Sequence, residues 1–128
     1  MKKSIICMFV AVMALTSCSS DDDNGSVSGS RDITYEITGN YSGDLDVTYI
    51  TASGGATSAE VTSLPWELSF TAEEGSPGAS FNAGGFEGQP GETISLKIYQ
   101  GDDLKNTVNA TADSDGIIVA VSGTVIIQ

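Results

Sequence analysis

Residues 33–37 read Ile-Thr-Tyr-Glu-Ile, and residues 94–98 read Ile-Ser-Leu-Lys-Ile. In both stretches an apolar side chain alternates with a polar one, which is the period of a strand with one buried and one solvent-facing side. The same alternation recurs at residues 45–49 and 66–70. These four stretches predict strands of a half-buried sheet.

Further strands are expected where the apolar pattern is less regular. Residues 117–121 and 124–127 are nearly continuous apolar runs, which are typical of a strand buried on both faces or central in its sheet. A weaker strand is predicted at residues 104–112, and a short one at residues 79–83 with Phe81 pointing inward.

Turn-forming residues separate these segments. Within residues 31–128, which we call the body of the chain, no stretch repeats its apolar residues at the 3.6-residue helical period. The turn signals are Gly39-Asn40, Ser42-Gly43, Ser53-Gly54-Gly55, Gly101-Asp102-Asp103 and Asp113-Ser114-Asp115-Gly116. Short strands joined by such turns predict an all-β fold. We expect residues 31–128 to form a single antiparallel β-sandwich, immunoglobulin- or transthyretin-like, of about seven strands.

The N-terminal 17 residues are predicted to be a lipoprotein signal peptide. Two lysines precede an apolar stretch of 11 residues, which is shorter than the about 20 residues of a membrane span. The next residues resemble the lipobox of bacterial lipoproteins, which implies lipid attachment, palmitate included, at the cysteine. That motif is Leu15, Thr16, Ser17 and Cys18. The alternative is an ordinary signal peptide cleaved near Ser17.

Residues 18–30 are predicted to be an acidic and Gly/Ser-rich tether. Its first part resembles the surface-export signal of Bacteroidetes lipoproteins, and consists of Ser19, Ser20, Asp21, Asp22 and Asp23. That resemblance implies an outer-membrane protein, anchored by lipid and exposed on the cell surface. The alternative is a solvated acidic spacer on a domain that faces the periplasm.

Composition limits the chemistry that the chain can perform. It holds 17 acidic and 5 basic residues, no histidine, and a formal net charge of −12, so nucleic acid is a poor partner. Its two cysteines, Cys7 and Cys18, both precede the body, which leaves the body without a cysteine nucleophile or zinc cluster. We therefore expect no enzyme activity, no cofactor and no metal.

The middle of the chain, residues 33–101, resembles the mycobacterial small membrane protein (MmpS) family. The resemblance is carried by residues 33–39, Val47-Thr48-Tyr49, Leu64-Pro65-Trp66 and residues 94–98. It implies a non-catalytic transport-accessory protein with a β-sandwich outside the membrane, beside transporters of the resistance-nodulation-division type. This chain departs from the family in having a lipobox in place of a transmembrane helix, and no cysteine pair in the late strands.

Aromatic residues offer the candidates for binding. Trp66 is either an exposed anchor or, as its alternation with Leu68 and Phe70 favours, part of the core. Residues 75–91 are rich in glycine, which indicates turns and a bulge around a short strand at Phe81. In that segment Phe81 and Phe86 would line a binding loop.

Carboxylate pairs occur in or beside the predicted turns, at Asp44 with Asp46, Asp102 with Asp103, and Asp113 with Asp115. Calcium takes such ligands, but the complete loop pattern is absent, which favours solvated turn aspartates.

The sequence therefore predicts a transport-accessory or scaffolding domain held on a membrane through Cys18, with an envelope transporter as its partner. The alternative is a cell-surface module that binds or adheres to a glycan or host protein.

Overall fold

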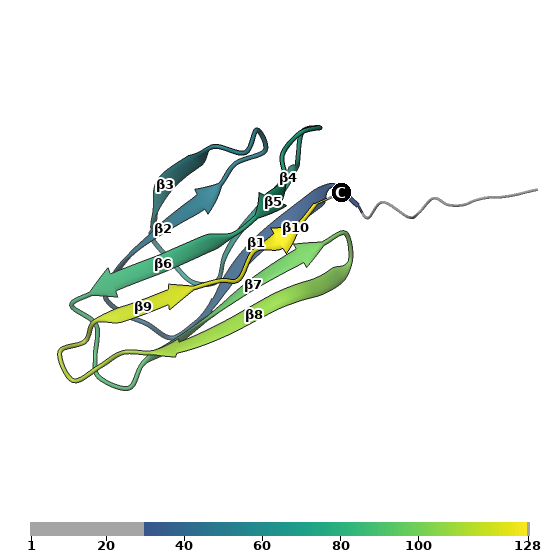
Figure 1. Ribbon diagram of the computed structural model, residues 1–128. Coiled ribbons are helices and arrows are strands. Elements are labelled where there is room, and N and C mark those ends of the chain that lie inside the picture. The colour runs from purple at the N-terminus through teal and green to yellow at the C-terminus, as the bar shows by residue number, and fades with distance from the viewer. Residues whose placement is uncertain (1–29, 128) are drawn as a thin grey trace, which may run out of the picture.

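A computed structural model describes residues 30–127, and in this range the chain forms ten strands and no helix (Figure 1). The predicted signal peptide, lipobox, Cys18 and export signal lie outside the described residues. The all-β antiparallel sandwich is confirmed, with ten strands where about seven were expected. The strands are β1 (Asp32–Gly39), β2 (Asp44–Ile50), β3 (Ala56–Val61), β4 (Trp66–Thr71), β5 (Gly78–Ala79), β6 (Phe81–Phe86), β7 (Thr93–Gln100), β8 (Asp103–Thr111), β9 (Ile118–Val121) and β10 (Val125–Ile126).

Two four-stranded antiparallel sheets pack against each other (Figure 1). Sheet one has the strand order β4-β1-β7-β8, and sheet two has the order β3-β2-β6-β9. The short strands β5 and β10 pair with each other as a separate two-stranded ribbon. Each sheet thus has two edge strands, and the chain passes between the sheets several times.

The alternating stretches place their apolar side chains between the sheets. Ile33, Tyr35 and Ile37 of β1 are fully buried, while the residues between them face solvent in part. In the neighbouring strand β7, Leu96 lies opposite Ile37 and Ile98 lies opposite Tyr35. Since burial of one such side chain stabilises a fold by about 1.5–3 kcal/mol, this central pair of strands is a main source of stability.

An aromatic cluster fills the centre of the core. The Tyr35 ring lies 4.6 Å from that of Phe81 and 5.3 Å from that of Phe70, measured between centroids. The Tyr35 hydroxyl donates a 2.8 Å hydrogen bond to the Ile50 carbonyl, and burial raises the pKa of Tyr35 to about 12. Trp66 packs against this cluster beside Phe81, so its prediction as a core residue is confirmed.

Both ends of the domain meet at one pole of the sandwich, which we call the proximal pole (Figure 1). The Ile127 amide donates to the Pro77 carbonyl at 3.0 Å, and the Arg31 guanidinium donates to the neighbouring Ser76 carbonyl at 3.2 Å. The opposite end, the distal pole, consists of the connections at residues 40–43, 62–65, 87–92 and 112–117. Ser30, the first described residue, therefore enters the domain at the proximal pole.

Two segments differ from the expected strands. Strand β3 was not predicted, because as an edge strand it exposes four of its six residues and carries little apolar alternation. Strand β6 runs on through Gly84 and Gly85 to Phe86 in the interior of sheet two. The expectation of turns and a bulge around a short Phe81 strand was therefore wrong at these two positions, because Gly84 and Gly85 both lie within a regular inner strand.

Candidate binding surface

Phe81 and Phe86, the residues of the predicted binding loop, belong to one strand and face opposite sides. Phe81 is 2 % exposed and stacks on Tyr35, whereas Phe86 is 51 % exposed at the distal end of β6. Side chains five positions apart in a strand point to opposite faces. The structure therefore does not bring the two together: Phe81 is part of the core, and only Phe86 is open to solvent.

The outer side of strand β9 is a row of exposed apolar side chains. Ile118 and Ala120 are buried, while Val119 is 67 % and Val121 is 61 % exposed, and Ile117 just before the strand is 45 % exposed. The sequence predicted a strand buried on both faces or central in its sheet, and that prediction was wrong, because β9 is an edge strand with one face in solvent. Contiguous exposed apolar side chains of this kind mark interaction sites.

We call Phe86, Ile117, Val119 and Val121 the apolar strip. Phe86 belongs to β6, which pairs with β9, so the strip covers the β9 side of the outer face of sheet two. Its members are one aromatic and three β-branched residues, of which the aromatic Phe86 is of a type enriched in protein interfaces.

A row of four residues crosses the same outer face, one from each strand of sheet two. Asp46 lies opposite Glu60 on β3 and opposite Gly84 on β6, and Gly84 lies opposite Val119 on β9. Directly opposed residues have Cβ atoms about 5 Å apart. Two exposed carboxylates, a position without a side chain and an exposed valine therefore stand side by side.

Gly84 and Gly85 have different surroundings. A Cβ on Gly85 would lie 2.6 Å from Tyr41 Cε2 and 2.6 Å from the Asp44 carbonyl oxygen, both far too close. A Cβ on Gly84 would meet only the Ile118 carbonyl oxygen at 3.9 Å, which is an ordinary contact. Packing therefore requires glycine at position 85, and the space over Gly84 is open to the outer face.

Tyr41 holds three distal connections together. Its ring packs against Gly85 and Gly88, and its hydroxyl donates a 2.6 Å hydrogen bond to the Gly116 carbonyl. The same carbonyl accepts a 3.2 Å bond from the Gly88 amide. Burial raises the pKa of the Tyr41 hydroxyl. The connections that flank the distal ends of β6 and β9 are thus held in place, and with them the exposed apolar side chains there.

Glu92 provides a second link at the distal pole. Its carboxylate accepts hydrogen bonds from the amides of Gln89 and Ser42 at 2.8 and 3.0 Å, and from the Ser42 hydroxyl at 2.9 Å. The Gln89 and Ser42 amide bonds hold the pKa of Glu92 below its ordinary value. This carboxylate therefore joins the β1–β2 and β6–β7 connections.

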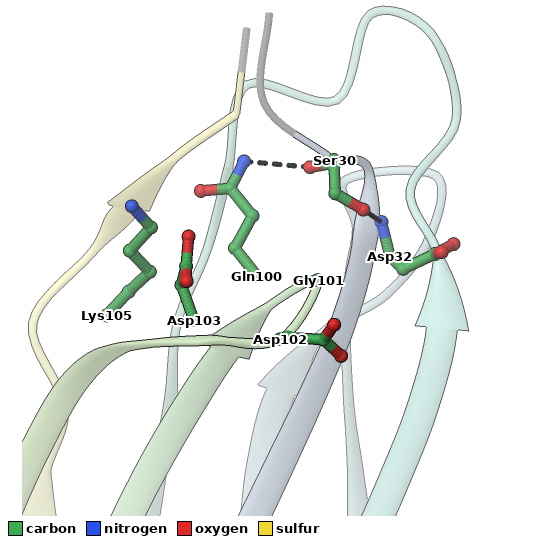
Figure 2. Close-up of a pocket in the computed structure, with 7 residues that line it drawn as sticks. All are labelled: Ser30, Asp32, Gln100, Gly101, Asp102, Asp103 and Lys105. Atoms are coloured by element: carbon green, nitrogen blue, oxygen red, sulfur yellow. Dashed lines mark hydrogen bonds between the residues drawn. The ribbon is translucent and has the colours of Figure 1, made fainter. Parts of the chain in front are cut away.

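A polar cavity of about 520 Å³ opens at the proximal pole, beside the β7–β8 turn (Figure 2). The Gln100 amide donates a 2.8 Å hydrogen bond to the Ser30 carbonyl, and the Ser30 hydroxyl accepts a 3.0 Å bond from the Asp32 amide. Figure 2 shows Lys105 and Asp103 on one side of Gln100. These contacts hold the first described residues of the domain at this pole.

A second hollow of about 300 Å³ at this pole is mostly apolar and lies against β5 and β10. It is lined by Ile50, Gly54, Pro77, Gly78, Ser80, Thr124 and Ile126.

The predicted turn aspartates lie in separate places. Asp113 Oδ1 accepts hydrogen bonds from the amides of Asp115 and Ile117 at 2.9 and 3.0 Å, the geometry of an aspartate that closes its own turn. Asp102 and Asp103 are at the β7–β8 turn, and Asp46 is within β2. Among residues 30–127 no three acidic, cysteine or histidine side chains are grouped to hold a metal ion.

Sequence reasoning missed three parts of this surface: Gly84, the exposure of β9, and Tyr41. The Gly84-Gly85 pair stood between Phe81 and Phe86, so continuing the alternation through it would have found the strand. The apolar run at residues 117–121 predicted a strand, but a continuous run has no polar positions that would show which side faces solvent.

Comparison of the chain with protein-family models, curated proteins and solved structures gives no significant match. In the part of the chain that the structure describes, no helix is long and apolar enough to cross a membrane.

Proposed function

We propose that this chain is a non-catalytic lipoprotein of the cell envelope whose β-sandwich binds a protein partner, as a scaffolding or transport-accessory domain. The observation that carries the proposal is the apolar strip, above all Val119 and Val121 at 67 % and 61 % exposure on an edge strand. Exposure of such a surface to water is unfavourable, and the free energy falls when another protein covers it.

Lipid on Cys18 would hold the domain at the membrane, with residues 19–30 as its tether. The position of Ser30 at the proximal pole supports this arrangement, because the apolar strip lies on an outer face and reaches the distal pole. A partner beside or beyond the domain then has access to the strip.

The resemblance to the MmpS family suggests an envelope transporter as the partner. The acidic segment after Cys18 suggests instead a surface position with a host protein as ligand. An apolar strip favours protein over glycan in either setting, since glycans present mainly hydroxyl groups and need polar partners.

In-cell photo-crosslinking tests the binding role. A photoreactive amino acid is placed at Val119 in the full chain with Cys18 intact, and the control position is Thr107, an exposed residue on the outer face of sheet one. We expect one defined envelope protein, identified by mass spectrometry, to be joined to position 119 and not to position 107. Equal adducts at positions 119 and 107, or no adduct at position 119, would contradict the binding role.

Protease shaving of intact cells, with a periplasmic control protein, tests the side of the membrane. Cleavage of the domain would favour a host ligand, whereas protection that is lost on lysis would favour a transporter. Cys18→Ala should release the chain to the soluble fraction, and a variant that stays membrane-bound would contradict the lipid anchor.

A further inference from the structure

The outer face of sheet two combines three unfavourable features at neighbouring positions. Gly84 occupies an inner strand although no contact requires glycine there, and glycine in a strand is less favourable than alanine. Asp46 and Glu60 place two like charges directly opposite each other, which is also destabilising. Val119 and Phe86 expose apolar area beside them.

Gly84 has a backbone conformation that other residues can adopt, because its φ angle does not lie in the positive region where several other glycines of this chain lie. Its missing side chain leaves a notch in the outer face. The notch has Val119 on one side and Asp46 on the other, with Phe86 two positions along the same strand. Glycine within a strand often marks a place where another molecule approaches the backbone closely.

The charge around the notch is of one sign. The described bases Arg31, Lys97 and Lys105 belong to sheet one or to the segment that leads into it, and the strands of sheet two carry no basic residue. The two opposed carboxylates thus face solvent without a cation from their own sheet, on a chain whose formal net charge is −12.

We propose that this notch receives an arginine or lysine side chain from the protein partner, which rests on the binding role proposed above. The aliphatic stem lies over Gly84, between Val119 and Phe86, and the cationic head reaches Asp46 and Glu60. One side chain thereby covers apolar area, offsets the repulsion between the two carboxylates and occupies the open space over Gly84. Phe86 adds apolar contact for the aliphatic stem.

Chemical-shift mapping with two matched peptides tests the assignment. The probe is Ac-Thr-Val-Arg-Val-Thr-NH₂, and its control carries citrulline, which has the shape of arginine without the charge. The full ¹⁵N-labelled chain is used in non-ionic detergent. We expect saturable shifts centred on Asp46, Gly84, Phe86 and Val119 with the arginine peptide, and binding at least fivefold weaker with citrulline.

Substitutions locate the effect. Gly84→Val fills the notch, and its Cβ has room. It should weaken binding of the arginine peptide at least fivefold while circular dichroism stays unchanged. Asp46→Asn should weaken it two- to fivefold. The matched controls on the other outer face, Thr107→Val and Glu67→Gln, should leave it unchanged.

Equal binding of the two peptides, shifts spread over carboxylates throughout the surface, or full binding by Gly84→Val would overturn the inference. Concentration-dependent shifts at the notch without peptide, with a dimer in sedimentation, would also overturn it in favour of a second copy. If peptide binding fails while Val119 still forms its specific crosslink, the notch is wrong and the binding role stands. If both fail, both are wrong.

Discussion

Gly84 and Gly85 are neighbours in strand β6, but they face opposite sides of sheet two and have different surroundings. On the inner side, the Tyr41 ring and the Asp44 carbonyl occupy the space where a Cβ on Gly85 would stand. On the outer side, a Cβ on Gly84 would touch only one backbone oxygen at an ordinary distance. Folding therefore accounts for Gly85 and does not account for Gly84. The residue that folding leaves unexplained is the better indicator of function.

The largest expected effect comes from Gly85→Ala. Its methyl group would lie 2.6 Å from a Tyr41 ring carbon and from a backbone oxygen, and such overpacking lowers the free energy of unfolding by about 1–3 kcal/mol. Urea denaturation measures this loss, with Gly55→Ala as the control because a Cβ there would meet only the Thr51 hydroxyl, at 3.8 Å. Unchanged stability would mean that the Tyr41 ring is free to move, and the contrast between the two glycines would disappear.

The buried tyrosines on the inner side should also make the free energy of unfolding fall at high pH. Burial raises the pKa of Tyr35 from 10.0 to about 12 and raises that of Tyr41 as well, so the folded state favours the neutral phenols. Their contribution is complete below pH 10 and is lost as the pH rises toward 12. Urea midpoints between pH 8 and 12 should fall more steeply for the wild type than for Tyr35→Phe. Parallel curves for the two proteins would contradict this assignment.

The sequence predicts the buried faces of the strands better than their solvent-facing sides. The alternation of Ile33, Tyr35 and Ile37 is enough to predict a strand and its inward face, because that pattern reflects burial alone. The apolar run of β9 does not show whether its second face is covered within the chain, so Val119 and Val121 were assigned to the wrong environment.

The candidate site was less accessible to sequence reasoning than the fold. The row from Glu60 to Val119 joins four strands of which only β2 and β3 are consecutive in the chain, and the pairing order brings them together. Tyr41 stands outside the regular strands, in the β1–β2 connection, so no periodic pattern marks it. Phe86, which was predicted to line a binding loop, is exposed, but its partner in that prediction, Phe81, lies in the core.

Tyr41→Phe separates the packing of the Tyr41 ring from the hydrogen bond of its hydroxyl. The ring remains against Gly85, but the 2.6 Å bond to the Gly116 carbonyl is lost, which should lower the free energy of unfolding by about 1 kcal/mol. Hydrogen exchange of the Gly88 and Gly116 amides should also accelerate, since these connections meet at that carbonyl. Tyr99→Phe on the outer face of sheet one is the matched control. A loss as large as that of Gly85→Ala would show that the hydroxyl, and not the ring, organises the distal pole.

The smallest expected effect has the opposite sign. Gly84→Ala places a methyl group where there is room for it and removes the flexibility of glycine in the unfolded chain, so the free energy of unfolding should rise by about 0.5–1 kcal/mol. Urea denaturation beside Gly85→Ala gives the comparison directly, because both variants add one methyl group to adjacent positions of β6. A loss of stability at position 84 would show that its glycine is required by the fold after all. A gain would mean that the natural sequence keeps a less stable residue where it faces solvent between a valine and a carboxylate, which is expected if a partner occupies that space.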